Sequence, residues 1–211
     1  MKTLLLLRHG KSSWKDTHLA DQERPLSKRG QRDSHTMGHL LLDRELVPQV
    51  VLSSSAKRTA QTAEILCEDC REIGPVHLLD ELYLAEPAAY LDVLHTLPEG
   101  IERVMVIGHN PGLEALLLTL GRRIEAMPTA ALAHLALPIS SWAELTQETE
   151  GELVDFWTPQ DVQDIAEQAE KEKDKHKEEK HKEKEEHKDK NEHKKEKEKH
   201  KEEDKKSKKK K

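Results

Sequence analysis

Short apolar runs alternate with longer mixed stretches along the first 160 residues of the chain. Four consecutive leucines at residues 4–7 form the first run, and this pattern predicts a strand that is buried on both faces of a sheet. Further apolar runs occur at residues 50–53, 76–79, 103–108, 131–137 and 152–157. Each of these runs predicts a strand, and the last is expected at an edge of the sheet.

The stretches between these runs have the periodicity of amphipathic helices. We expect helices at about residues 28–44, 54–71, 90–97 and 110–120. Ser27 is the expected N-cap of the first helix, and Asn110 and Pro111 are expected at the N-cap and N1 positions of the last. Strands that alternate with such helices predict an α/β fold, here a three-layer α/β/α domain with a mostly parallel central sheet.

Three of the predicted strands are followed by residues that can bind an anion. Arg8 and His9 follow the first strand, Arg58 lies in the first turn of the helix after the second, and His109 follows the strand at 103–108. Ligands of parallel sheets bind beyond the carboxyl ends of the strands, so these residues are expected to meet. Arginine binds oxyanions with two parallel hydrogen bonds, and histidine can attack or move protons. Gly10 is expected to let a ligand approach the backbone.

Each of these residues has an ordinary structural explanation when it is taken alone. A histidine at a strand end is often satisfied by a backbone hydrogen bond, and an arginine is often a surface charge. Arg58, however, would oppose the dipole of its helix at a cost of about 0.3–1 kcal/mol, which suggests an anion nearby. Because arginines and histidines follow three different strands, the sequence favours a pocket that is selective for a dianionic phosphoryl group.

The charge of the chain is divided between two regions. Residues 171–211 contain 20 Lys, 14 Asp plus Glu and no apolar residue, so this low-complexity tail carries +6 and the preceding 170 residues carry −12. We therefore expect a domain at 1–160, a linker at 161–170, and a tail at 171–211 that is disordered or a solvated helix. The five tail histidines do not share a helical face, so no dedicated metal site is expected there, while loose metal binding stays open.

Composition also bears on location and on the two cysteines. No apolar segment reaches the ~20 residues of a membrane span, and the first apolar run is too short for a signal peptide. We expect a cytoplasmic monomer with neither a membrane nor a nucleic-acid partner. Cys67 and Cys70 form a C-x-x-C pattern, but Glu68 and Asp69 between them would raise the thiol pKa values. Burial on a helix face is therefore favoured over a redox role.

Several motifs in this order resemble the histidine phosphatase superfamily, and within it the small SixA-type phosphohistidine phosphatases. They are residues 7–14 (LRHGKSSW), 21–30 (DQERPLSKRG), 53–59 (SSSAKRT), 108–112 (GHNPG) and 156–159 (FWTP). The resemblance covers about residues 1–160, without an inserted cap domain, and it implies a phosphoglycerate-mutase-like fold. The chain departs from the mutase-like members at Lys15, where they carry an asparagine.

The resemblance implies a role for each residue at the strand ends. His9 would be the nucleophile that becomes transiently phosphorylated, while Arg8, Arg58 and His109 would hold the phosphoryl oxygens. Gly10 and Ser12 would complete the substrate-binding residues. Phosphoryl transfer depends mainly on positioning and charge neutralisation, which two arginines and a protonated histidine could supply without a metal. No cofactor and no metal are expected, since the sequence has neither a paired-carboxylate motif nor HExxH.

Many phosphatases of the superfamily also use a carboxylic acid to protonate the leaving alcohol. Glu81 is our candidate for this acid and Asp80 is the next, although an ordinary solvated pair at a strand end is as good an explanation. We expect a phosphatase that acts on phosphohistidine in a histidine-phosphorylated signalling or phosphotransfer domain. The alternatives are a phosphatase of small phosphate monoesters and a phosphoprotein-binding module without turnover.

Overall fold

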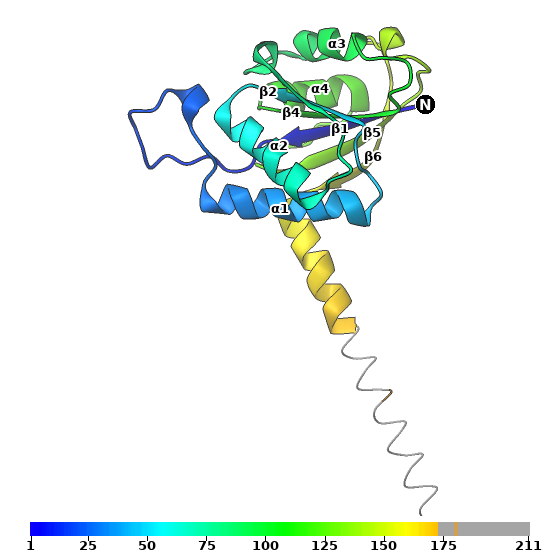
Figure 1. Ribbon diagram of the computed structural model, residues 1–211. Coiled ribbons are helices and arrows are strands. Elements are labelled where there is room, and N and C mark those ends of the chain that lie inside the picture. Colours follow the sequence, from blue (N-terminus) through cyan, green and yellow to red (C-terminus); the bar gives the residue numbers. More distant parts are fainter. Residues whose placement is uncertain (173–179, 181–211) are drawn as a thin grey trace, which may run out of the picture. The chain divides into compact units, whose positions relative to one another are not determined.

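The computed structural model describes residues 1–172 and Lys180 and divides the chain into two units, Met1–Gln163 and Asp164–Lys211. The first unit is built on one sheet with the strand order β3-β2-β4-β1-β5-β6 (Figure 1). Its strands are β1 (Lys2–Arg8), β2 (Val50–Ser54), β3 (Val76–Leu79), β4 (Arg103–Gly108), β5 (Leu132–Leu137) and β6 (Glu152–Trp157). The four strands from β3 to β1 pair in parallel, whereas β5 and β6 add antiparallel pairs.

Four α-helices cover the sheet. They are α1 (Lys28–Asp43), α2 (Lys57–Asp69), α3 (Pro87–His95) and α4 (Gly112–Gly121). Three short 3-10 helices lie in the connections between the strands: η1 (Asp21–Glu23), η2 (Asp80–Leu82) and η3 (Trp142–Glu144). Helices α1 and α2 lie on one side of the sheet in Figure 1, and α3 and α4 lie on the other. The predicted α/β/α architecture and the mostly parallel sheet are confirmed.

The leucine run of β1 joins the two halves of the core. Leu4 and Leu6 belong to the cluster under α3 and α4, while Leu5 and Leu7 belong to the cluster under α1 and α2. All four side chains are at most 1% exposed. Because successive side chains of a strand point to opposite faces, only a strand covered on both sides can bury such a run.

The predicted helix starts are partly correct. The Oγ of Ser27 accepts a hydrogen bond from the Gly30 amide at 3.1 Å, so Ser27 is the N-cap of α1. Asn110 is not the N-cap of α4, because this helix begins at Gly112 with Pro111 at the cap. The Asn110 amide instead donates to the Glu114 carboxylate and to the Met127 carbonyl, which ties α4 to the loop before β5.

Other boundaries also differ from the expectation. Helix α2 begins at Lys57, not residue 54, because Ser54 still pairs within β2. Cys70 at the end of α2 is buried, whereas Cys67 is only partly so, and both are free thiols. Strand β6 lies at an edge of the sheet, as expected.

The second unit is described only at residues 164–172 and Lys180. Residues 164–172 are helical and exposed. Residues 161–170, which the sequence analysis assigns to a linker, are helical throughout, and the rest of the expected tail lies outside the described residues. In the described part of the chain, no helix has both the length and the apolar character that a membrane span requires.

Candidate active site

The sheet brings three strand ends together at one edge. Arg8, the last residue of β1, is in register with Gly108, the last residue of the parallel strand β4. His9 and His109 therefore leave adjacent strands side by side, and their ring centroids are 5.1 Å apart. Strand β2 pairs with β4 on its other side, and Arg58 follows β2 in the first turn of α2.

Arg58 links the two histidines. Its Nε donates to Nε2 of His9 at 3.3 Å, and its Nη2 donates to Nδ1 of His109 at 3.2 Å. The Arg58 residue is only 4% exposed. The structure thus brings together three of the four residues that the sequence predicts to surround the phosphoryl group.

The hydrogen bonds assign a tautomer to each ring. Nδ1 of His9 lies 2.7 Å from the Gly10 carbonyl oxygen, so this nitrogen carries the proton and donates. Nε2 of His9 then presents a lone pair to Arg58, as a nucleophile must. In His109, Nδ1 accepts from Arg58, and Nε2 carries the proton and donates to the Oγ of Ser54 at 2.9 Å.

Both imidazole rings are held neutral. Burial, together with the charges of Arg58 and Arg8, lowers the pKa of His9 to about 4 against the opposing effects of the Gly10 carbonyl and Asp21. Burial, followed by the charge of Arg58, lowers the pKa of His109 to about 3. A neutral His9 keeps its lone pair at pH 7, which is the protonation state that attack on phosphorus requires.

Arg8 lies beside this cluster without a hydrogen bond to it. Its Nη1 donates to the Met127 carbonyl at 2.6 Å, while its Nε has no partner among the described residues. Burial lowers the pKa of Arg8, and the charge of Glu114 opposes this shift. The carbonyl of Met127 thus fixes one end of the guanidinium group.

Gly10 and Ser12 have structural contacts. A Cβ at Gly10 would lie 2.6 Å from the Gly30 carbonyl oxygen, so the glycine permits close packing on α1, which the sequence analysis did not foresee. The Gly10 amide is already bound to the Oγ1 of Thr62 at 3.1 Å. The Oγ of Ser12 accepts from Nη2 of Arg24 at 2.7 Å.

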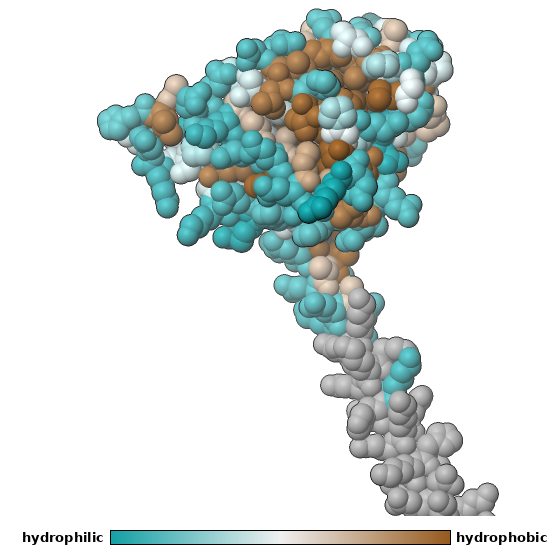
Figure 2. Space-filling model, in the orientation of Figure 1, coloured by the Kyte–Doolittle hydropathy of each residue, from teal (hydrophilic) through white to brown (hydrophobic). Residues whose placement is uncertain are grey.

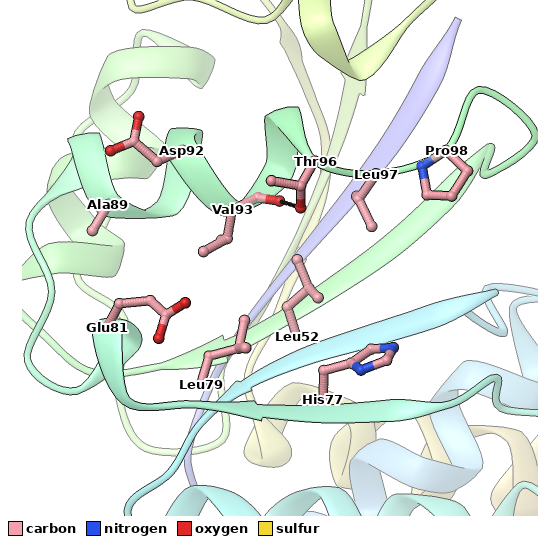
Figure 3. Close-up of a pocket in the computed structure, with 10 residues that line it drawn as sticks. All are labelled: Leu52, His77, Leu79, Glu81, Ala89, Asp92, Val93, Thr96, Leu97 and Pro98. Carbon is pink, nitrogen blue, oxygen red and sulfur yellow. Dashed lines mark hydrogen bonds between the residues drawn. The ribbon is translucent and has the colours of Figure 1, made fainter.

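The carboxylate of Glu81 lines a separate cavity. This cavity has a volume of about 500 Å³ and lies between β3 and α3, where Glu81 shares it with Leu52, Leu79 and Val93 (Figure 3). The same region is seen as brown, apolar surface beneath α3 in Figure 2. Within residues 1–172, no hydrogen bond or ion pair joins Glu81 to the cluster around Arg58.

Tyr83, two residues beyond Glu81, reaches the cluster instead. Its hydroxyl donates to Oδ2 of Asp21 at 2.8 Å, and its ring stands edge-on to His109 with the centroids 5.6 Å apart. The segment after β3 therefore presents a phenol to the site. Sequence reasoning missed Tyr83, because a lone tyrosine in a loop carries no pattern.

Asp21 is the second residue that sequence reasoning missed as part of the site. Its carboxylate accepts from Nη2 of Arg58 at 2.9 Å and from Nη1 of Arg24 at 2.8 Å. Burial raises the pKa of Asp21, but the hydrogen bond from Tyr83 and the charges of both arginines outweigh it, and the net shift is downward. The sequence did offer a signal, because Asp21 belongs to the motif at residues 21–30 and a buried arginine such as Arg58 needs a counter-ion.

Over residues 1–172 and Lys180, no group of three or more His, Cys, Asp or Glu side chains is arranged to hold a metal ion.

Comparison with known proteins places these residues in context. A model of the histidine phosphatase superfamily (branch 1) matches residues 4–84. An uncharacterised chloroplastic protein of Arabidopsis thaliana is 31% identical over 153 residues, which cover 68% of this chain and 70% of the relative. A protein assigned as the phosphohistidine phosphatase SixA of Agrobacterium tumefaciens has a similar structure, with a TM-score of 0.65 and 28% identity, covering 75% of this chain and 98% of the other.

A second solved structure agrees in fold. The protein histidine phosphatase SixA in complex with tungstate has a TM-score of 0.65 and 24% identity, and the match covers 76% of this chain and 99% of that one. It supports the arrangement of the sheet and helices described above.

Proposed function

Since this chain belongs to the histidine phosphatase superfamily and has a SixA-like, phosphoglycerate-mutase-like fold, we propose that it removes phosphate from phosphohistidine on a protein. The family and the structural neighbours support phosphatase activity, and phosphohistidine as the substrate is our proposal. The observation that carries the mechanism is the unprotonated Nε2 of His9, which faces the buried guanidinium of Arg58 at 3.3 Å.

In the first step, the lone pair on Nε2 of His9 attacks phosphorus and the bond from phosphorus to the substrate's imidazole nitrogen breaks. The electron pair of that bond stays on the departing nitrogen, and His9 becomes phosphorylated. Arg8 and Arg58 would bind the oxygens of the transferring group, and His109 would hold Arg58 in place, because its Nδ1 accepts from Nη2 of Arg58 while its Nε2–H donates to Ser54. Donors fixed in advance where charge develops lower the barrier, and the loss of one costs about 10²–10³ in rate.

In the second step, water attacks the phosphorus of phosphorylated His9. The bond from phosphorus to Nε2 breaks, its electron pair returns to Nε2, and the protons of the water pass to orthophosphate and solvent. The Gly10 carbonyl, which binds Nδ1–H of His9 at 2.7 Å, would keep the ring oriented through both steps. The ring is thereby restored to the tautomer with which it began.

The groups around Arg58 favour a substrate whose leaving group departs without a strong acid. Asp21 is ionised, because the shift in its pKa is downward, and burial together with the Asp21 carboxylate raises the pKa of Tyr83. Neither group is a strong acid at neutral pH. An alkoxide needs a proton to depart, whereas imidazole needs much less help. This difference supports phosphohistidine over an alkyl phosphate.

The test compares two phosphoproteins with the full chain. We expect phosphate release from a phosphotransfer protein phosphorylated on histidine, and much slower release from the same amount of a phosphoserine protein. Equal rates on both would favour a general phosphatase of phosphate monoesters. Binding of the phosphohistidine protein without release would identify a binding module instead of an enzyme.

A further inference from the structure

Both terminal nitrogens of Arg58 donate hydrogen bonds to Asp21. Nη1 donates to the main-chain oxygen of Asp21 at 2.6 Å, and Nη2 donates to Oδ2 of Asp21 at 2.9 Å. These are the donors that a phosphoryl group would use under the proposed function. Any phosphoryl oxygen that binds Nη2 must therefore compete with Asp21.

The two partners differ in their access to water. The side chain of Asp21 is 47% exposed, whereas that of Arg58 is 5% exposed. The carboxylate thus lies at the mouth of the site and can turn toward solvent, while the guanidinium is fixed within the protein. A buried guanidinium that loses its counter-ion is costly, so the carboxylate stabilises the empty site.

A second arginine offers the displaced carboxylate a partner. Nη1 of Arg24 binds Oδ1 of Asp21 at 2.8 Å, on the carboxylate oxygen that Arg58 does not use. Arg24 is itself held by the Ser12 hydroxyl at 2.7 Å and by the ring of Trp14, whose centroid lies 3.2 Å from its Cζ. Asp21 can therefore release Arg58 while it keeps one charged hydrogen bond.

The backbone around Asp21 is anchored independently of its carboxylate. Nε2 of Gln22 donates to the Oγ of Ser55 at 3.0 Å, which ties η1 to the loop before α2. Arg58 also holds the main-chain oxygen of Asp21, and this contact does not depend on the side chain. Rotation of one side chain is then sufficient to open the anion position.

We propose that Asp21 sets the anion affinity of this site: its carboxylate occupies the phosphoryl position on Arg58 in the empty protein and is displaced when a dianion binds. A dianion outcompetes the carboxylate because it carries more charge, whereas a monoanion does not. Return of the carboxylate also promotes release of orthophosphate. The inference rests on the proposed function for the identity of the anion, but it is tested by binding alone.

The experiment titrates inorganic phosphate into the full-length protein by calorimetry. Asp21→Asn keeps the shape of the side chain and removes its charge, and Asp21→Glu restores the charge. Glu23→Gln is the matched control, because Glu23 is an exposed carboxylate in the same short helix. If the carboxylate leaves Arg58 free in about one molecule in ten, Asp21→Asn binds phosphate about tenfold more tightly than wild type.

Two further readouts separate competition from a structural role. Without phosphate, Asp21→Asn is expected to melt at a lower temperature than wild type, and phosphate is expected to raise its Tm by more. Asp21→Glu and Glu23→Gln are expected to bind phosphate as wild type does. In turnover, the KM and the inhibition constant of phosphate are expected to fall together in Asp21→Asn.

Tyr83→Phe provides a second route if Asp21→Asn does not fold. It removes the hydroxyl that donates to Oδ2 of Asp21 at 2.8 Å. The affinity for phosphate is expected to rise, as in Asp21→Asn, but by a smaller factor. Unchanged or weaker phosphate binding in Asp21→Asn, with Glu23→Gln unaffected, overturns the inference. Tighter binding in a protein that releases no phosphate from any substrate supports the inference and contradicts only the proposed function.

Discussion

Arg58 donates its Nε–H to the same nitrogen of His9 that is expected to attack phosphorus, over 3.3 Å. This hydrogen bond fixes the tautomer of His9 before substrate arrives and aims the lone pair into the cluster. When Nε2 bonds to phosphorus, its lone pair is consumed and the Arg58 donor becomes available to a phosphoryl oxygen. One guanidinium therefore orients the nucleophile in the empty protein and stabilises charge in the transition state.

The first prediction concerns the nucleophile. His9→Ala is expected to lower turnover of an aryl phosphate on the order of 10⁴-fold or more, since no other group can take over the covalent step. Phosphate binding should persist, because Arg8, Arg58 and His109 remain. His39→Ala is the control, as His39 is exposed on α1. Acid-labile phosphate should be trapped on wild type and not on His9→Ala; full turnover by this variant would exclude the covalent mechanism.

The second prediction concerns the shape of the guanidinium. Arg58→Lys retains a positive charge but cannot reach His9, His109 and Asp21 at once, since lysine lacks the planar fork. We expect kcat/KM to fall about 10²–10³-fold. Lys57→Ala, at the exposed neighbouring position, is expected to have no comparable effect. Retention of wild-type kcat/KM in Arg58→Lys would show that charge alone is needed.

Comparison of these residues with the sequence shows what pattern can and cannot predict. The leucines of β1 admit one arrangement, since only a strand covered on both faces buries all four. Once the strands are placed in parallel, the positions of Arg8, His9 and His109 follow from strand register. The sequence therefore predicts the fold and the half of the site that holds the arginines and histidines.

The acidic half of the site follows from contacts that no periodicity encodes. Asp21 lies in the irregular stretch between β1 and α1, and Tyr83 lies just beyond η2. Both reach Arg58 or its partner only because two loops converge over the strand ends. Glu81 illustrates the same limit. Spacing along the chain does not determine which residue of the segment after β3 faces the cluster around Arg58.

The third prediction follows from the two neutral histidines. Their pKa values, about 4 for His9 and about 3 for His109, lie below the ordinary value of 6.5. Between pH 6.5 and 4 the unfolded chain therefore binds more protons than the folded one, so stability rises with pH across this window. Asp21 also has a lowered pKa, but its contribution is lost only below its ordinary value of 3.8.

Urea unfolding at several pH values from 7 to 4.5 measures this dependence. The free energy of unfolding of wild type is expected to fall over this range, and that of His9→Gln to fall less, because this variant has lost one of the two buried imidazoles. His39→Gln, altered at an exposed position, should retain the wild-type slope. Equal slopes for wild type and His9→Gln would contradict a lowered pKa at His9.

The fourth prediction concerns residues 171–211. The two hydrophobic clusters of the core lie entirely within the unit Met1–Gln163. Deletion of residues 171–211 is therefore expected to leave the melting temperature and the hydrolysis of a small aryl phosphate nearly unchanged. A large drop in either would show that these residues support the domain. A loss confined to a phosphoprotein substrate would indicate a docking role for them.

The last prediction concerns the leaving-group acid. Glu81 lines the cavity beneath α3 (Figure 3). Tyr83, from the same segment, contacts Asp21 beside Arg58. If Glu81 supplies a proton in the transition state, Glu81→Gln should slow hydrolysis of an alkyl phosphate by about 10²–10⁴-fold. Phosphohistidine should be slowed only slightly, since its imidazole departs without that proton.

Asp80→Asn is compared with Glu81→Gln, because Asp80 is the other carboxylate of η2 and the next candidate for the acid. Kinetics on both substrates then separate three outcomes. Unequal slowing in Glu81→Gln alone identifies the acid, and equal slowing on both substrates shows that Glu81 serves the structure or the electrostatics of the pocket. If neither variant slows the alkyl phosphate, no carboxylate of η2 acts as the acid. The site would then depend on a good leaving group, which is the property that distinguishes phosphohistidine from a phosphate monoester.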